Sequence, residues 1–313
     1  MKIKLLAVII VLLAISFVPF LIPIAQQEGL VDYKELAQED SQFVNIFGID
    51  IHFKDTGERE DTQQTYILLH GFGSSTYTWE KVTEKLSENA RVISYDRPAF
   101  GLTQRVTNWG KFNPYTPESQ RDIVIQLMNE LDIQEAVLMG HSAGGLVALN
   151  TYLRYPERIS ELILVAPAIY EVNLFTKYLR PLFNLAQINR LGPLFVRRIG
   201  RDGQEMIKAA WYDESKVTQQ DIDAYTKPLG IINWDIALWN LTKHTYSLRP
   251  EERLSEVTIP VLIITGDSDT IVIPENSIRL AEEIPAARIE IIERCGHVPQ
   301  EECPEEFLDI VLN

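Results

Sequence analysis

The sequence is poor in positive charge. Its 313 residues contain 29 Lys and Arg against 44 Asp and Glu, which gives a formal net charge of −15 at pH 7. Phosphate backbones and anionic lipid surfaces repel such a chain, so we expect no nucleic-acid partner. A glycine-rich phosphate loop is also lacking, and no group of His, Cys and Asp residues has the spacing of metal ligands. No cofactor or metal is therefore predicted.

Cysteine is scarce as well. Cys295 and Cys303 are the two present, eight positions apart, on either side of a loop that contains a histidine. They could form a disulfide if the domain is exported, or they could stay free thiols in a hydrophobic setting. Spacing does not show whether their Cβ atoms approach each other, so both states stay open.

One long hydrophobic run stands at the N-terminus. Residues 5–22 are apolar apart from two positions, and as a helix they would span about 27 Å, close to the thickness of a bilayer core. Lys2 and Lys4 precede the run and acidic residues follow it, so we expect residues 1–25 to anchor the chain with its remainder on the outer side of the membrane. A cleaved signal peptide, which would give a secreted protein, is the alternative. Residues 26–41 are polar and acidic and are expected to be a linker.

Short apolar runs alternate with helical patterns along most of the remaining chain. Hydrophobic residues make up 46% of the sequence and charged residues 23%, so a sizeable core can be buried. The alternation predicts an α/β fold with a mostly parallel sheet. In the opening hairpin, His52 is expected to be a solvated strand residue. Strands are expected at 43–53, as that hairpin, and at 65–69, 91–95, 136–139, 161–166, 259–265 and 288–292.

The strand at 136–139 leads into Gly140-His141-Ser142-Ala143-Gly144, and a helical pattern follows directly. A strand that turns sharply into a helix would hold Ser142 in a strained conformation at the tip of the turn. Gly140 and Gly144 would flank it because side chains there would collide as strand and helix approach. This pattern is typical of a nucleophile elbow, and a tight turn with an idle serine is the alternative.

Two further motifs follow strands: residues 70–73 read His-Gly-Phe-Gly and residues 96–101 read Asp-Arg-Pro-Ala-Phe-Gly. The three motifs, in this order and spacing, resemble the α/β-hydrolase superfamily over roughly residues 42–170 and 250–313. The chain departs from the pattern at Ala99, where relatives commonly carry glycine. The resemblance implies the α/β-hydrolase fold, with a mostly parallel, doubly wound sheet.

The regular alternation stops between residues 169 and 248. This segment resembles the helical cap that many relatives insert, which divides the chain into a core at 42–168 and 249–313 and a cap at 169–248. Such a cap would act as a lid that shapes an apolar pocket and excludes water. Most of its aromatic side chains are expected to hold the cap together, and a few to line the pocket. Its large apolar residues include Phe175, Tyr178, Leu179, Phe195, Trp211, Trp234 and Trp239.

A serine hydroxyl becomes a good nucleophile only when a base takes its proton and a third group orients the base. Ser142, Asp269 and His297 stand in the chain order expected for this superfamily, and the last two follow predicted strands. The carboxyl ends of parallel strands meet at one edge of a sheet, where Ser142 would also lie. Asp267 competes for the orienting role, but the Gly-x-x-Asp pattern of relatives selects Asp269.

The resemblance also implies an oxyanion hole, formed by the backbone N–H groups of Phe72 and Ala143. Ala143 would open the helix, so the positive end of the helix dipole would face the developing charge. His70 is expected to be structural. His141 is next to Ser142 but cannot fold back to act as its base.

These residues predict a serine hydrolase that cleaves a small, apolar carboxylic ester through an acyl-enzyme. Two alternatives stay open: a second enzymatic one, a carbon–carbon bond hydrolase of the meta-cleavage type on the same triad, and one from another class, a non-catalytic, membrane-tethered binding module. Cofactor-free haloperoxidase activity is a further possibility. Epoxide hydrolases and haloalkane dehalogenases are disfavoured, since those relatives carry Asp where this chain has Ser142. The oligomeric state is not predicted.

Overall fold

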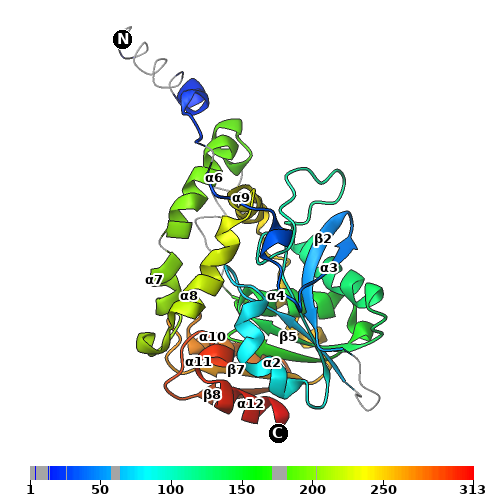
Figure 1. The fold of residues 1–313 in the computed structure, drawn as a ribbon. Helices are drawn as coiled ribbons and strands as arrows, with labels where there is room; N and C mark the ends of the chain where they lie inside the picture. Colours follow the sequence, from blue (N-terminus) through cyan, green and yellow to red (C-terminus); the bar gives the residue numbers. More distant parts are fainter. Residues whose placement is uncertain are drawn as a thin grey trace.

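The computed structural model describes residues 4, 13, 15–25, 27–57, 64–170, 182–201 and 203–313. At the centre of this described part lies an eight-stranded sheet with the strand order β1-β2-β4-β3-β5-β6-β7-β8 (Figure 1). β2 pairs antiparallel with β1 and with β4, whereas the remaining pairs are parallel. The expected mostly parallel sheet is therefore confirmed. The strands are β1 (Gln42–Ile46), β2 (Ile49–Asp55), β3 (Thr65–Leu69), β4 (Arg91–Tyr95), β5 (Ala136–His141), β6 (Ile159–Val165), β7 (Val261–Gly266) and β8 (Ala287–Ile292).

Successive residues of the central strands point to opposite faces of the sheet, and helices cover each face. Leu138 of β5 belongs to an apolar cluster with α3 (Pro117–Glu130), α4 (Ala143–Arg154) and α10 (Pro274–Glu283). Its neighbours Val137 and Met139 belong to a second cluster with α2 (Glu80–Leu86) and α12 (Pro304–Leu312). All six residues of β5 are buried, which explains why its first four, Ala136 to Met139, form a continuous apolar run. The sheet is therefore doubly wound.

Between β6 and β7 the described residues are mainly helical. We call these residues, 182–201 and 203–248, the helical insertion; Figure 1 shows it to one side of the sheet. Trp234 and Trp239 are buried in a cluster with Phe100 of the core, whereas Phe195 is exposed. The expected roles of Phe175, Tyr178 and Leu179 lie outside the described residues. Its helices are α6 (Ala186–Arg201), α7 (Gly203–Ala209), α8 (Gln219–Thr226) and α9 (Trp234–His244).

Much of the predicted signal anchor, residues 1–25, lies outside the described residues. Among the residues that the structure does describe, no helix combines the length and apolar character needed to cross a bilayer. The anchor, the cleaved signal peptide and the outer-side location stay predictions. Most described residues of the expected linker, 26–41, are exposed, but Tyr33 is buried and its hydroxyl donates to the Asp50 carboxylate at 2.9 Å, so the segment is fixed to the domain at this residue.

The expectation that His52 faces solvent is wrong. Its side chain is buried, with Nδ1 2.6 Å from Asp96 Oδ2 and Nε2 2.9 Å from the Ser41 hydroxyl oxygen. The physical reason is that β2 pairs with β4, and the turn that follows β4 places the Asp96 carboxylate beside β2. Burial disfavours the charged form of this carboxyl, but contact with His52 and the backbone N–H of Leu102 together lower its pKa to about 2.

Candidate active site

The turn between β5 and α4 has the geometry that the sequence predicts. Ser142 adopts φ 52° and ψ −118°, a conformation that L-residues rarely take. A Cβ on Gly144 would lie 2.2 Å from the carbonyl oxygen of Leu69, and one on Gly140 would lie 2.6 Å from the Gly144 carbonyl oxygen. Only bare backbone fits at these two positions. The elbow therefore presents Ser142 at the end of the central strand.

Asp269 and His297, which are 28 residues apart in the chain, lie in contact. Nδ1 of His297 is 2.7 Å from Oδ2 of Asp269, and both side chains are buried. The other carboxylate oxygen accepts the backbone N–H groups of Ile271 and Val272, at 2.8 and 2.9 Å. With both oxygens occupied, the carboxylate is fixed, and a proton on Nδ1 leaves Nε2 as the acceptor.

Asp267, the competitor for this contact, faces elsewhere. It is exposed and accepts hydrogen bonds from the Ser268 hydroxyl and the backbone N–H of Arg294. The choice of Asp269 over Asp267 as the partner of His297 is therefore consistent with the geometry.

Ser142, His297 and Phe72 line one pocket, which the helical insertion completes. Its volume is about 230 Å³, where a single water needs about 10–15 Å³, so it can hold a small organic molecule. Asp269 lies behind His297, and Ala143 is the first residue of α4. The residues that the insertion contributes are Gly200, Gly203, Met206, Ile207, Ala210, Trp211, Tyr225, Thr226, Leu229, Trp234 and Leu238.

The peptide group between Gly71 and Phe72 is held in one orientation. The Gly71 carbonyl accepts from His70 Nδ1 at 2.7 Å and from Arg97 Nη2 at 3.0 Å. Because C=O and N–H point in opposite directions across a trans peptide, the Phe72 N–H points away from these two side chains. Burial, followed by the charge of Arg97, lowers the pKa of His70 to about 3, so this histidine is neutral. The structural role expected of His70 is confirmed.

His141 has a role that the sequence does not reveal. Its Nε2 lies 2.8 Å from the backbone carbonyl oxygen of His297, 156 positions along the chain. Burial above all, and then the nearby His297, lowers the pKa of His141 well below its ordinary value. The ring is therefore neutral and can donate Nε2–H to that carbonyl. His141 helps to hold the loop that carries His297.

The turn after β4 explains the departure at Ala99. This residue has φ 79°, in the region that favours glycine. The next glycine, Gly101, has φ 48°, and a Cβ there would lie 1.9 Å from the Asp96 carboxylate. The turn therefore keeps glycine where space forbids a side chain and tolerates alanine where only conformational strain opposes it.

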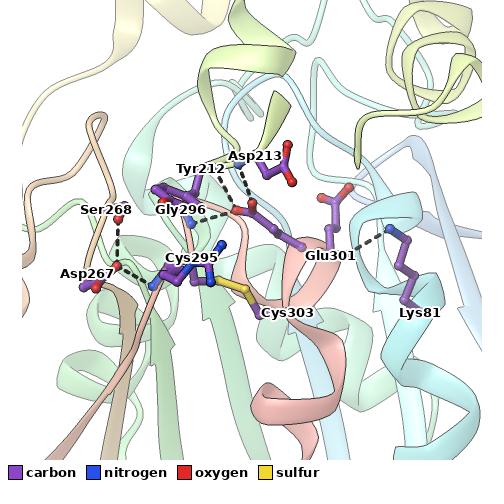
Figure 2. Close-up of a disulfide and its surroundings, with 11 residues drawn as sticks. Lys81, Tyr212, Asp213, Asp267, Ser268, Cys295, Gly296, Glu301 and Cys303 are labelled. Atoms are coloured by element: carbon purple, nitrogen blue, oxygen red, sulfur yellow. Dashed lines mark hydrogen bonds between the residues drawn. A yellow bond between two sulfur atoms is a disulfide. The ribbon is translucent and has the colours of Figure 1, made fainter. Parts of the chain in front are cut away.

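Cys295 and Cys303 are joined in a disulfide, which answers the question that spacing left open. Figure 2 shows this disulfide. The loop it closes contains His297 and also Glu302, whose buried carboxylate accepts three backbone N–H groups. Within the described residues, the two cysteine sulfurs and a carboxylate oxygen of Glu302 lie within 4.8 Å of one another. Thiolate and carboxylate groups are common metal ligands. Here the sulfurs are bonded to each other and the carboxylate is occupied by its donors.

A second buried carboxyl, that of Glu301, links the insertion to the core. It accepts the hydroxyl of Tyr225 at 2.5 Å and the hydroxyl of Thr78. Tyr225 also lines the pocket, and the backbone carbonyl of Glu301 accepts Lys81 Nζ at 2.9 Å (Figure 2). Burial raises the pKa of the Glu301 carboxyl to about 7.

Glu301→Gln is expected to flatten the dependence of stability on pH. The folded chain keeps the Glu301 proton up to about pH 7, whereas the unfolded chain loses it near pH 4.5. The contribution of Glu301 to the free energy of unfolding therefore falls as pH rises between these values. Relative to the variant, the wild type should lose about 3 kcal/mol of its free energy of unfolding between pH 4.5 and pH 8. Urea unfolding at both pH values measures this difference. Equal pH dependence in the two proteins would contradict it, and Glu305→Gln, an exposed neighbour, serves as the control.

Comparison with known proteins agrees with this geometry. The family model described as alpha/beta hydrolase fold matches residues 66–304. The chain belongs to the α/β-hydrolase family.

Among curated proteins, an uncharacterized hydrolase of Bacillus subtilis, YugF, is 27% identical over 81% of this chain and 89% of its own length. A 2-hydroxy-6-oxononadienedioate/2-hydroxy-6-oxononatrienedioate hydrolase of Comamonas testosteroni is 27% identical over 84% of this chain and 90% of its own length. The solved structure of a thermophilic esterase from Thermogutta terrifontis matches with a TM-score of 0.66 and 25% identity, covering 88% of this chain and 97% of that chain. The similar proteins therefore include an esterase and a hydrolase of unsaturated 2-hydroxy-6-oxo dicarboxylates.

Proposed function

We propose that the protein is a serine hydrolase that cleaves carboxylic esters of small, uncharged, apolar substrates. The observation that carries this proposal is the pocket of Ser142 and His297, which is lined mainly by apolar side chains. Among the described residues that line it, none is Lys or Arg. A carboxylate placed in such a pocket would lose its hydration without gaining a charged partner, which is costly.

In the proposed mechanism, Ser142 Oγ attacks the ester carbonyl and passes its proton to Nε2 of His297. Asp269, bonded to Nδ1 at 2.7 Å, keeps the ring in the required tautomer and stabilises the imidazolium. The N–H groups of Phe72 and Ala143 would stabilise the oxyanion, and the helical insertion would act as the cap that excludes water. His297 returns the proton to the departing alcohol. A water then attacks the acyl-enzyme with His297 again as base, and the acid leaves.

Carbon–carbon bond hydrolysis is the second candidate, because a relative of that activity is 27% identical. The name of that relative describes a substrate with two carboxylates. A chain that acts on such a dianion would be expected to place cationic side chains in its pocket. The lining residues therefore favour the ester reaction, or a carbon–carbon substrate without charged ends.

The two candidates separate in one assay series. Purified protein is given p-nitrophenyl esters of increasing acyl length, a vinylogous diketone that bears a carboxylate, and its neutral methyl ester. We expect kcat/KM on the best ester to exceed that on the carboxylate-bearing diketone by at least about 10²-fold, the factor for a buried, unpaired charge worth about 3 kcal/mol. Preference for the charged diketone would overturn the proposal, and preference for the neutral diketone would favour the second candidate.

A further inference from the structure

We propose that Glu302 is a positioning residue that ties the helical insertion to the loop bearing His297, so that the insertion and the imidazole are set in place together. The inference rests on the proposed function, in which His297 is the base. Glu302 does not line the pocket, and it acts through the backbone.

The carboxylate of Glu302 joins two segments that are distant in sequence. Oε2 accepts the N–H of Gly296, at 2.7 Å, from the His297 loop and the N–H of Tyr212, at 2.9 Å, from the insertion. Oε1 accepts the N–H of Asp213 at 2.8 Å. Glu302 is 5% exposed, so water competes little for these bonds. One side chain thus satisfies donors from both segments.

The same two segments also touch directly. The N–H of His297 donates to the carbonyl of Ala210 at 2.7 Å. A Cβ on Gly296 would lie 2.5 Å from that carbonyl oxygen and 2.6 Å from the Tyr212 nitrogen, so the two backbones are in close contact. Because Ala210 and Trp211 line the pocket, a substrate that presses on the insertion acts on a segment bonded to His297.

The opposite side of the loop is fixed to the core. The Cys295 carbonyl accepts the N–H of Ser268 at 3.1 Å, and the His297 carbonyl accepts Nε2–H of His141. The Cys295–Cys303 disulfide closes the loop immediately after Glu302. The loop is therefore held between the core and the insertion, and the disulfide limits how far Glu302 can move.

The chemistry of the site requires a carboxylate. An ionised Glu is acceptor-only, and its two oxygens can accept all three N–H groups. In Glu302→Gln one oxygen becomes an NH₂ donor, which would face a backbone N–H. At least one of the three bonds must then break, and a buried donor is left without a partner. The substitution keeps the size of the side chain and changes its hydrogen-bonding.

The test compares wild type, Glu302→Gln and Glu306→Gln, a control at an exposed position four residues further on. The readouts are kcat and KM on the best ester, at a temperature where thermal melting shows each protein to be folded. A misplaced base lowers kcat by about 10- to 100-fold and leaves KM within about threefold, because the apolar side chains that line the pocket are unchanged. Glu306→Gln should match wild type. A role in stability alone would lower the melting temperature and leave kcat of the folded protein unchanged, which would overturn the proposal.

Reduction of the disulfide in the wild type tests the same link without a substitution. We expect kcat to fall by about tenfold with KM nearly constant, and to recover on reoxidation. An unchanged kcat after complete reduction overturns the proposal even where Glu302→Gln does not fold. A wild type that hydrolyses no ester contradicts the proposed function, and this inference falls with it. An active wild type beside an equally active Glu302→Gln contradicts this inference alone.

Discussion

Ser142→Ala is expected to lower kcat on the best ester by about 10⁵–10⁶-fold, because the variant has no hydroxyl to form the acyl-enzyme. The proposed oxyanion donors and the pocket remain, so a weak residual rate above that in water is expected. The substitution keeps Cβ and removes only the hydroxyl oxygen, so the strained turn at φ 52° should fold as before. Ester turnover and covalent labelling by a fluorophosphonate probe measure the loss, and labelling should disappear with Ser142.

The chain offers a matched control in Ser41. Its hydroxyl lies 2.9 Å from Nε2 of His52, whose Nδ1 contacts Asp96, so the three residue types are linked in the same order as in the proposed triad. Ser41 does not stand on a strand-to-helix elbow and does not line the pocket of Ser142. Ser41→Ala should therefore keep full turnover and labelling. Labelling that survives in Ser142→Ala and disappears in Ser41→Ala would contradict our assignment of the nucleophile.

Local sequence patterns predict the elbow and the sheet for a physical reason. Gly140 and Gly144 are needed because neighbouring backbone atoms occupy the space that a side chain at either position would take. Glycine is therefore required two residues before and two residues after Ser142, which is a pattern that the sequence itself displays. The apolar runs of β3 and β5 are continuous because both faces of these strands are buried. Asp269 and His297 each follow a strand of the parallel sheet, so topology alone brings them to one edge.

The remaining features depend on contacts between single residues that are far apart in the chain. His52 meets Asp96 over 44 positions, and Glu302 meets Tyr212 over 90. Such pairs carry no periodic signal, since one polar residue in a strand or after a turn fits a solvated position equally well. The disulfide is a similar case, because spacing does not fix the direction of two Cβ atoms. Sequence patterns therefore locate the proposed catalytic residues but not the residues that hold them.

Asp269→Asn is expected to lower kcat by about 10⁴-fold and to change KM little. An amide at this position can accept through one oxygen, but its NH₂ group would face either the backbone N–H groups of Ile271 and Val272 or Nδ1 of His297. The backbone donors cannot rotate, so the oxygen is expected to turn to them and the NH₂ group to Nδ1. The proton of the imidazole then moves to Nε2, which can no longer accept the proton of Ser142.

Asp267→Asn is the control, two residues away and equally negative. Asp267 accepts hydrogen bonds from the Ser268 hydroxyl and the backbone N–H of Arg294, both away from the imidazole. The kcat of Asp267→Asn should therefore stay within about twofold of wild type, since substitutions at exposed positions usually have small effects. The kcat values of both variants, with circular dichroism to verify folding, decide the assignment. Comparable losses in the two variants would mean that negative charge near the end of β7, and not the 2.7 Å contact with His297, supports turnover.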